Sequence, residues 1–225
     1  MCFSATVSYS TAAVLVTTGT YAFHHARRLP LPYWLLALVP VFFGMQQGFE
    51  GRVWQEIDAA RASAAVPFAL GFHFFSHFLW LWWFPLCSAL LEQGKVRRRV
   101  FLGLGIFGAL AGGLVYFTIL LHPDWMSVAV RQHSIIYTVT SSYRSPISLP
   151  FPESALYALV VLVPLLFSSH RHIRIFGVLV AVSMVLASLA YGYAFVSVWC
   201  FFAAAISLYL VYMIRSLHWP ANPRI

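Results

Sequence analysis

The fold class is decided by residues 100–121, which read VFLGLGIFGALAGGLVYFTILL and contain no charged side chain. A helix needs about 20 apolar residues to cross the hydrocarbon core of a bilayer, and this run meets that length. Residues 95–99 immediately before it read KVRRR, a basic cluster of the kind that flanks the cytoplasmic end of a spanning helix. The sequence therefore predicts an integral membrane protein.

The composition of the whole chain agrees with this prediction. Hydrophobic residues make up 61% of the 225 residues and charged residues only 9%, with a mean hydropathy of +0.80. Soluble domains have roughly 45–50% apolar and about 25% charged residues, and disordered chains are more polar still. Because each span takes about 20 residues, no room remains for a separate soluble catalytic domain. We expect residues 1–225 to form a single membrane domain.

Apolar runs along the chain predict about seven transmembrane helices. They cover approximately residues 6–24, 33–54, 65–91, 100–121, 152–168, 173–192 and 195–214. Of the 14 Lys and Arg residues, all but Arg52, Arg61, Arg131 and Arg144 fall on one side of these spans. The positive-inside rule then places the N-terminus outside and the C-terminus in the cytoplasm. The predicted fold is an all-α seven-transmembrane-helix bundle with one longer outer loop, residues 122–151, whose 127–139 part allows a short hairpin.

The net charge of +8 is explained by anchoring in the bilayer. Each basic cluster follows an apolar run, where contact with anionic lipid headgroups contributes about 1 kcal/mol per charge. The lipid bilayer is the expected partner, and no nucleic-acid partner is expected. Glycines in the second span (Gly44, Gly48, Gly51) and the fourth (Gly108, Gly112) have a spacing that allows close helix packing, within the bundle, in a homo-oligomer or with a membrane partner.

A candidate site begins in the second span, where Gln46, Gln47, Glu50 and Trp54 share one helix face at 100° per residue. At 1.5 Å per residue, Glu50 lies roughly 6–9 Å from the outer end of its span. An ionisable side chain at such a depth is costly and marks a functional site by default. The second span therefore predicts a buried polar site in the outer half of the bundle.

The third span supplies the other half of this site. His73 and His77 are four residues apart and stack on one side of the helix, with Ser76 beside them and Trp80 a turn below. A short outer loop joins the second and third spans, so we expect these helices to be antiparallel neighbours. Their polar side chains would then converge, with Gln46, Gln47, Glu50, Trp54, Ser76 and Trp80 as the predicted ligand-binding residues.

Three functions fit this pattern, and the sequence leaves them open. His73, His77 and Glu50 match the ligands of a His₂Glu site for zinc or another transition metal, which would activate a bound water in a membrane enzyme. Asp124 or His133 would be the base if the outer loop folds over the site. A proton-coupled carrier or sensor would use Glu50 and the histidines without catalysis. In a structural subunit of a membrane complex, the same groups would only hydrogen-bond between helices.

Other cofactors fit less well. Two histidines on one helix cannot clamp a haem iron from both sides. The only lysine, Lys95, lies in a cytoplasmic loop, so no Schiff base to retinal can form inside the bundle. Cys87 is expected to fill space in the third span. Cys2 and Cys200 map to the outer side, where a disulfide, a thiolate or copper site, and unpaired burial are the alternatives.

Two motifs carry a resemblance to a known family. The opening Met1-Cys2-Phe3-Ser4-Ala5-Thr6 and the stretch Gln46-Gln47-x-x-Glu50-Gly51-x-Val53-Trp54 resemble an uncharacterised family of bacterial multi-pass membrane proteins. The resemblance implies a location in the bacterial inner membrane and assigns no activity. A looser similarity in span count and buried residue types links the chain to zinc hydrolases such as the alkaline ceramidases. Their Ser, Asp and His motifs are not visible here, so this similarity is one of fold alone.

Overall fold

The computed structural model describes residues 4–139 and 153–218. Met1, Cys2, Arg144 and Arg224, which enter the sequence predictions, lie outside these ranges. The helices are α1 (Ala5–Ala26), α2 (Leu31–Asp58), α3 (Val66–His73), α4 (Trp80–Leu91), α5 (Lys95–Leu121), α6 (Glu153–Leu166), α7 (Arg171–Tyr191) and α8 (Phe195–His218). Shorter helical turns are η1 (Ala62–Ala65), η2 (Phe74–Leu79), η3 (Pro123–Trp125) and η4 (Gly192–Ala194), and the strands are β1 (Met126–Arg131) and β2 (Ser134–Val139).

The structure confirms a predominantly helical fold, and the described residues of each predicted span are largely helical, with the third span divided into α3, η2 and α4. Among the described residues, three helical stretches are long and apolar enough to cross a membrane, namely Ala62–Leu91, Lys95–Leu121 and Arg171–Leu217. A shorter apolar helix covers Ala155–Leu166. Ser and Thr dilute the hydropathy of α1, and Gln, Glu and Arg dilute that of α2. These findings support a membrane protein without fixing how many helices cross the bilayer.

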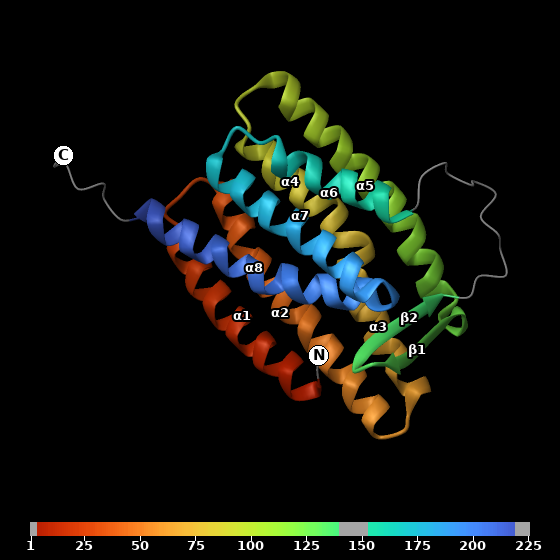
Figure 1. Cartoon of the computed structure of the whole chain (residues 1–225). Helices are drawn as coiled ribbons and strands as arrows, with labels where there is room; N and C mark the ends of the chain where they lie inside the picture. Colours follow the sequence, from red (N-terminus) through yellow and green to blue (C-terminus); the bar gives the residue numbers. More distant parts are fainter. Residues whose placement is uncertain (1–3, 140–152, 219–225) are drawn as a thin grey trace.

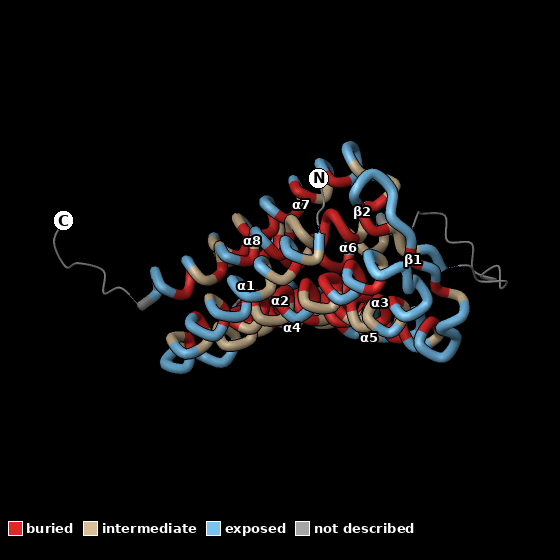
Figure 2. The backbone as a smooth tube through the Cα atoms, turned by 90° about the horizontal axis from the view of Figure 1, so that it is seen from below, coloured by how far each residue is buried: buried red, intermediate tan, exposed pale blue. Residues whose placement is uncertain are grey.

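The helices pack side by side into one bundle (Figure 1). α1 packs on α2, α2 on α3 and α4, α4 on α6, α6 on α7, and α7 on α8. α8 also packs against α1 and α2, so the helices form a closed ring. α5 packs against η2, α4 and α6. The buried positions face inward, and the outer faces of the helices are exposed (Figure 2). Exposed side chains of α5 and α7 are largely apolar, including Leu110, Leu114, Val182 and Leu189, as expected of surfaces that face lipid.

Glycines bring the helices of this chain close together. A methyl group added at Gly108 would lie 2.2 Å from the carbonyl oxygen of Leu81, and one at Gly112 would lie 2.5 Å from that of His77. Gly44 faces α1 in the same way, since an added methyl group would lie 2.7 Å from Val16. The glycine-bearing faces predicted in the second and fourth spans are thus used largely within the chain. Gly48 has open space around it.

A β-hairpin lies at the end of the bundle where α1 begins (Figure 1). β1 and β2 pair antiparallel, and both turn residues, Gln132 and His133, have positive φ angles of 48° and 59°. Two such residues in succession are typical of the tight turns that match the twist of a hairpin. Inward side chains of the hairpin, including Met126 and Ile135, join an apolar cluster with Val53 and Ala69. This cluster seats the hairpin on α2 and α3, and the hairpin allowed by the sequence is confirmed.

The opposite end of the bundle joins two loops through Glu92. The Glu92 side chain is buried, and its carboxylate accepts hydrogen bonds from the Ser169 backbone at 2.8 Å and from the Ser169 hydroxyl. Arg97 lies 3.7 Å away, and the His170 ring donates to the Leu91 carbonyl at 2.7 Å. Burial alone would raise the pKa of Glu92, but the bonds from Ser169 and Gly94 and the charge of Arg97 outweigh burial and lower it. Glu92 is therefore a charged clamp between the α4–α5 and α6–α7 loops.

Candidate ligand-binding site

Glu50 is the centre of a buried polar cluster between α2 and α8. The residue is only 3% exposed. Its Oε1 accepts a hydrogen bond from the Ser197 hydroxyl of α8 at 2.5 Å, and its Oε2 accepts one from Gln47 Nε2 at 3.0 Å. A buried carboxyl group needs such donors because water no longer solvates it. Ser197 was not predicted, because nothing in the sequence of an apolar helix tells which serine faces an acid on another helix.

The two glutamines beside Glu50 are completely buried. Gln46 Oε1 accepts a hydrogen bond from Trp80 Nε1 of α4 at 3.1 Å, so the predicted contact between the second and third spans is present. Gln46 Nε2 and Gln47 Oε1 have no nitrogen or oxygen partner among the described residues, and the Gln46 amide adjoins the Cys200 thiol, a weak acceptor. A buried polar atom without a partner costs about 1–3 kcal/mol. The amide nitrogen of Gln46 and the amide oxygen of Gln47 are therefore the polar atoms that the cluster presents to a further molecule.

His73 and His77 lie at a π-helical turn, a rare element that often occurs at functional sites. Their rings stack at 4.6 Å between centroids. His73 Nδ1 donates to the carbonyl of Ala69 at 2.8 Å, which fixes where one ring proton sits, and His77 Nδ1 is 2.9 Å from the Ser76 hydroxyl. Both rings are thus held by their own helix.

The predicted metal ligands do not form one coordination set in this structure. Within residues 4–139 and 153–218, no group of three or more His, Cys, Asp or Glu side chains is arranged to hold a metal ion. The carboxyl oxygens of Glu50 are engaged by Ser197 and Gln47, and the rings of His73 and His77 face each other. Shared helix faces thus brought the two histidines together but did not bring Glu50 to them.

Tyr137 of the hairpin closes the outer side of the cluster. Its ring stacks on Phe72 at 5.1 Å and meets the His73 ring edge-on at 4.6 Å, while its buried hydroxyl has no partner among the described residues. Burial raises the pKa of Tyr137 well above its usual range, and Glu50 and Cys200 raise it further. Tyr137 is therefore a neutral hydroxyl at the site. The loop residues expected there, Asp124 and His133, are exposed instead.

Of the other predicted site residues, Trp80 and Ser76 contact the predicted polar side chains, whereas Trp54 does not. Trp80 contacts Gln46, and Ser76 contacts His77. Trp54 is buried in the apolar cluster beneath the hairpin with Val53 and Leu70. Trp54 shares a helix face with Glu50 but lies one turn farther out, where apolar neighbours surround it. Cys87 and Cys200 are both free and buried, so Cys200 shows unpaired burial in this structure.

Comparison with known proteins supports the resemblance seen in the two motifs. Residues 1–224 match a family of unknown function (DUF6629). The chain belongs to this family. No curated protein and no solved structure shows detectable similarity to the chain. The matched range includes every residue of the polar cluster, but the family assigns no activity to these residues.

Proposed function

We propose that the protein is a multi-pass membrane protein that binds protons and a small polar ligand at Glu50, in the manner of a carrier or sensor. The single observation behind the proposal is the buried Glu50 carboxyl group, which is hydrogen-bonded by Ser197 and Gln47 beside amide atoms without partners. A buried ionisable group inside a membrane protein marks ligand or proton binding by default. The unpartnered amide atoms of Gln46 and Gln47 supply the hydrogen bonds for a second molecule.

The proposal includes seven crossings of a bacterial inner membrane, with the N-terminus outside and the C-terminus in the cytoplasm. Support comes from the basic residues. The end of α1 with Arg27 and Arg28, the start of α5, the start of α7 and the end of α8 lie together at one end of the bundle (Figure 1). The hairpin and the start of α1 lie at the other end. The positive-inside rule makes the basic end cytoplasmic and the hairpin external.

Binding without metal chemistry fits the cluster better than a metalloenzyme does. Zinc enzymes present three protein ligands to one ion, and the described residues form no such group. Packing alone explains the cluster less well, because helix-joining polar groups are expected to satisfy each other. Gln46 Nε2, Gln47 Oε1 and the Tyr137 hydroxyl do not do so.

The test uses the native thiol of Cys200, which lies on α8 one turn beyond Ser197. Its rate of modification by methyl methanethiolsulfonate is measured against pH in membranes, with Cys2 and Cys87 replaced. A carrier or sensor changes conformation on protonation, so we expect Glu50→Gln to alter the pH profile of the rate several-fold. Glu56→Gln, on the same helix but paired with Arg52 and Arg61, keeps the original profile. Identical profiles with and without the Glu50 carboxyl group would contradict the proposal.

A further inference from the structure

Three acidic side chains are buried among the residues that the structure describes, and they differ in how their charge is balanced. Glu56 pairs with two arginines, and Glu92 pairs with one. Glu50 has no such pair within residues 4–139 and 153–218, and both of its hydrogen bonds come from uncharged groups. A buried charge without an opposite charge is costly. The Glu50 carboxyl group must therefore be neutralised by a proton or by a bound cation.

The groups beside Glu50 carry oxygen atoms that can bind a cation. The Ser197 hydroxyl lies 2.5 Å from Oε1, and the Gln47 amide lies beside Oε2. The Gln47 oxygen and the Tyr137 hydroxyl are buried and have no partner among the described residues. Tyr137 lies within electrostatic range of Glu50. Carboxylate, amide and hydroxyl oxygens suit hard cations, whereas transition metals prefer imidazole and thiolate.

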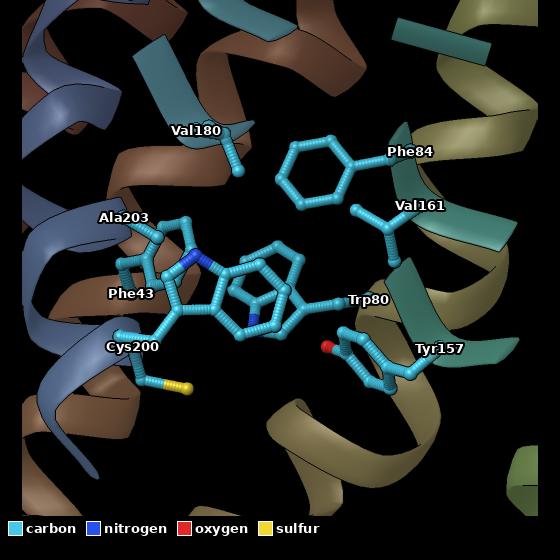
Figure 3. Close-up of a pocket in the computed structure, with 9 residues that line it drawn as sticks. Phe43, Trp80, Phe84, Tyr157, Val161, Val180, Cys200 and Ala203 are labelled. Carbon is cyan, nitrogen blue, oxygen red and sulfur yellow. The ribbon is translucent and has the colours of Figure 1, made fainter. Parts of the chain in front are cut away.

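The charge and the available space both limit this cation. One carboxylate balances one positive charge, so a divalent ion would keep an uncompensated charge inside the bundle. Trp80, which donates to Gln46, also lines a cavity of about 20 Å³ beside the cluster (Figure 3). One water needs roughly 10–15 Å³, so this cavity adds no room for a ligand of several non-hydrogen atoms. The cluster is therefore restricted to a monovalent ion no larger than a water.

We propose that Glu50 binds a small monovalent metal cation, with sodium as the ion to test, in competition with a proton. The oxygens of Ser197, Gln47 and Tyr137 complete the site. The cation is then the ligand of the proposed carrier or sensor, so this inference rests on that proposed function. Among the described residues, the other titratable groups that interact with Glu50 are Cys200 of α8 and Tyr137 of β2, and neither becomes positively charged. Proton and cation therefore compete at one carboxyl group, and binding of either releases the other.

Infrared spectroscopy of the protein in lipid bilayers tests the competition, because only the protonated carboxyl group has the C=O stretching band of a carboxylic acid. The band is titrated with pH in sodium chloride and in choline chloride at the same ionic strength, and is assigned to Glu50 by Glu50→Gln. We expect sodium to move the midpoint of the band to lower pH, by about one pH unit for each tenfold rise in sodium above its dissociation constant. Choline, which is too large for the site, should leave the midpoint unchanged.

Tyr137→Phe tests the site without disturbing the hydrogen bonds of Glu50. The Tyr137 hydroxyl has no partner among the described residues, so its removal should not destabilise the fold. We expect the variant to need several-fold more sodium for the same shift of the midpoint, because one oxygen ligand is lost. Tyr116→Phe is the matched control, since Tyr116 is a buried tyrosine of α5 that packs against Phe74 and Phe78. The control should keep the original response to sodium.

The outcomes separate the sodium site from the proposed function. A Glu50 band that titrates identically in sodium and in choline overturns the sodium site and leaves proton binding intact. A spectrum without a titrating Glu50 band overturns the proposed function as well. The sodium site is also overturned if calcium shifts the midpoint at lower concentrations than sodium, or if Tyr137→Phe responds to sodium as the original protein does.

Discussion

At the scale of single residues, the chemistry of the protein centres on a carboxyl group with donors from two helices. Gln47 is three residues before Glu50 on α2, whereas Ser197 is 147 residues away on α8. The helical period of α2 was enough to predict that Gln46, Gln47 and Glu50 share a face. It contains no information on Ser197 or Tyr137, because only the packing of distant segments brings these residues to Glu50.

Ser197→Ala tests how much this contact stabilises the protein. The variant leaves one buried oxygen of Glu50 without its donor, and we expect a loss of about 1–3 kcal/mol in the free energy of unfolding. Ser207→Ala is the matched control on α8, since the Ser207 hydroxyl is also buried but donates only to the Ala204 carbonyl of its own helix. Unfolding in detergent measures both variants. Equal losses would show that Ser197 has no special role toward Glu50.

At the scale of elements, the third predicted span contains a π-helical turn that the sequence pattern did not predict. A prediction at 100° per residue assumes a regular α-helix through His73 and His77, and their rings stack as predicted even though His77 lies within η2. The positions of the helices were predictable because apolar runs bounded by basic and Pro-containing loops fix them. A π-helical turn leaves no comparable signal in the pattern of apolar residues.

The tightest approach between α5 and α4 is at Gly108. Gly108→Ala would place a methyl group 2.2 Å from the Leu81 carbonyl oxygen, so we expect the helices to separate, at a cost of about 1–3 kcal/mol. Gly103→Ala on the same helix meets no atom within 4 Å and should be neutral or stabilising by up to about 1 kcal/mol. Thermal unfolding of both variants checks the contrast. A harmless Gly108→Ala would contradict this packing.

The Glu92 clamp predicts a pH dependence of stability. The hydrogen bonds of Glu92 lower its pKa below the usual 4.5. A lowered pKa stabilises the folded state at pH values above 4.5, and this contribution is lost as the pH falls through the lowered value. Glu92→Gln should therefore be less stable than the original protein near neutral pH, with the difference shrinking in acid. Asp58→Asn, at an exposed position, is the control, and a difference independent of pH would contradict the charged clamp.

At the scale of the whole molecule, the two ends of the bundle differ in charge, and a β-hairpin covers only one of them. One end holds most of the basic residues and the Glu92 clamp, and the other carries the hairpin above the Glu50 cluster (Figure 1). Composition along the chain predicted a membrane protein, which the three long apolar helical stretches support, and the orientation derived from its charges stays a prediction. Composition and charge did not predict that the hairpin contributes Tyr137 to the site, because loop paths depend on tertiary packing.

Cysteine labelling tests the proposed orientation. In a variant without native cysteines, Gln132→Cys in the hairpin turn and Gln93→Cys in the α4–α5 loop are both at exposed positions. We expect a membrane-impermeant maleimide to label the hairpin cysteine in spheroplasts, and the loop cysteine only after permeabilisation. The reverse pattern would invert the orientation and place the Glu50 cluster nearer the cytoplasm.

The central claim is that Glu50 exchanges a proton inside the bundle. Infrared difference spectroscopy of the protein in lipid bilayers, recorded as the pH is changed, measures this exchange through the carboxyl stretching band. We predict a band that titrates with pH, shifts when glutamate is labelled with ¹³C, disappears in Glu50→Gln and remains in Glu56→Gln. If Glu50→Gln leaves every titrating carboxyl band unchanged, then Glu50 only joins α2 to α8, and the proposed binding function is wrong.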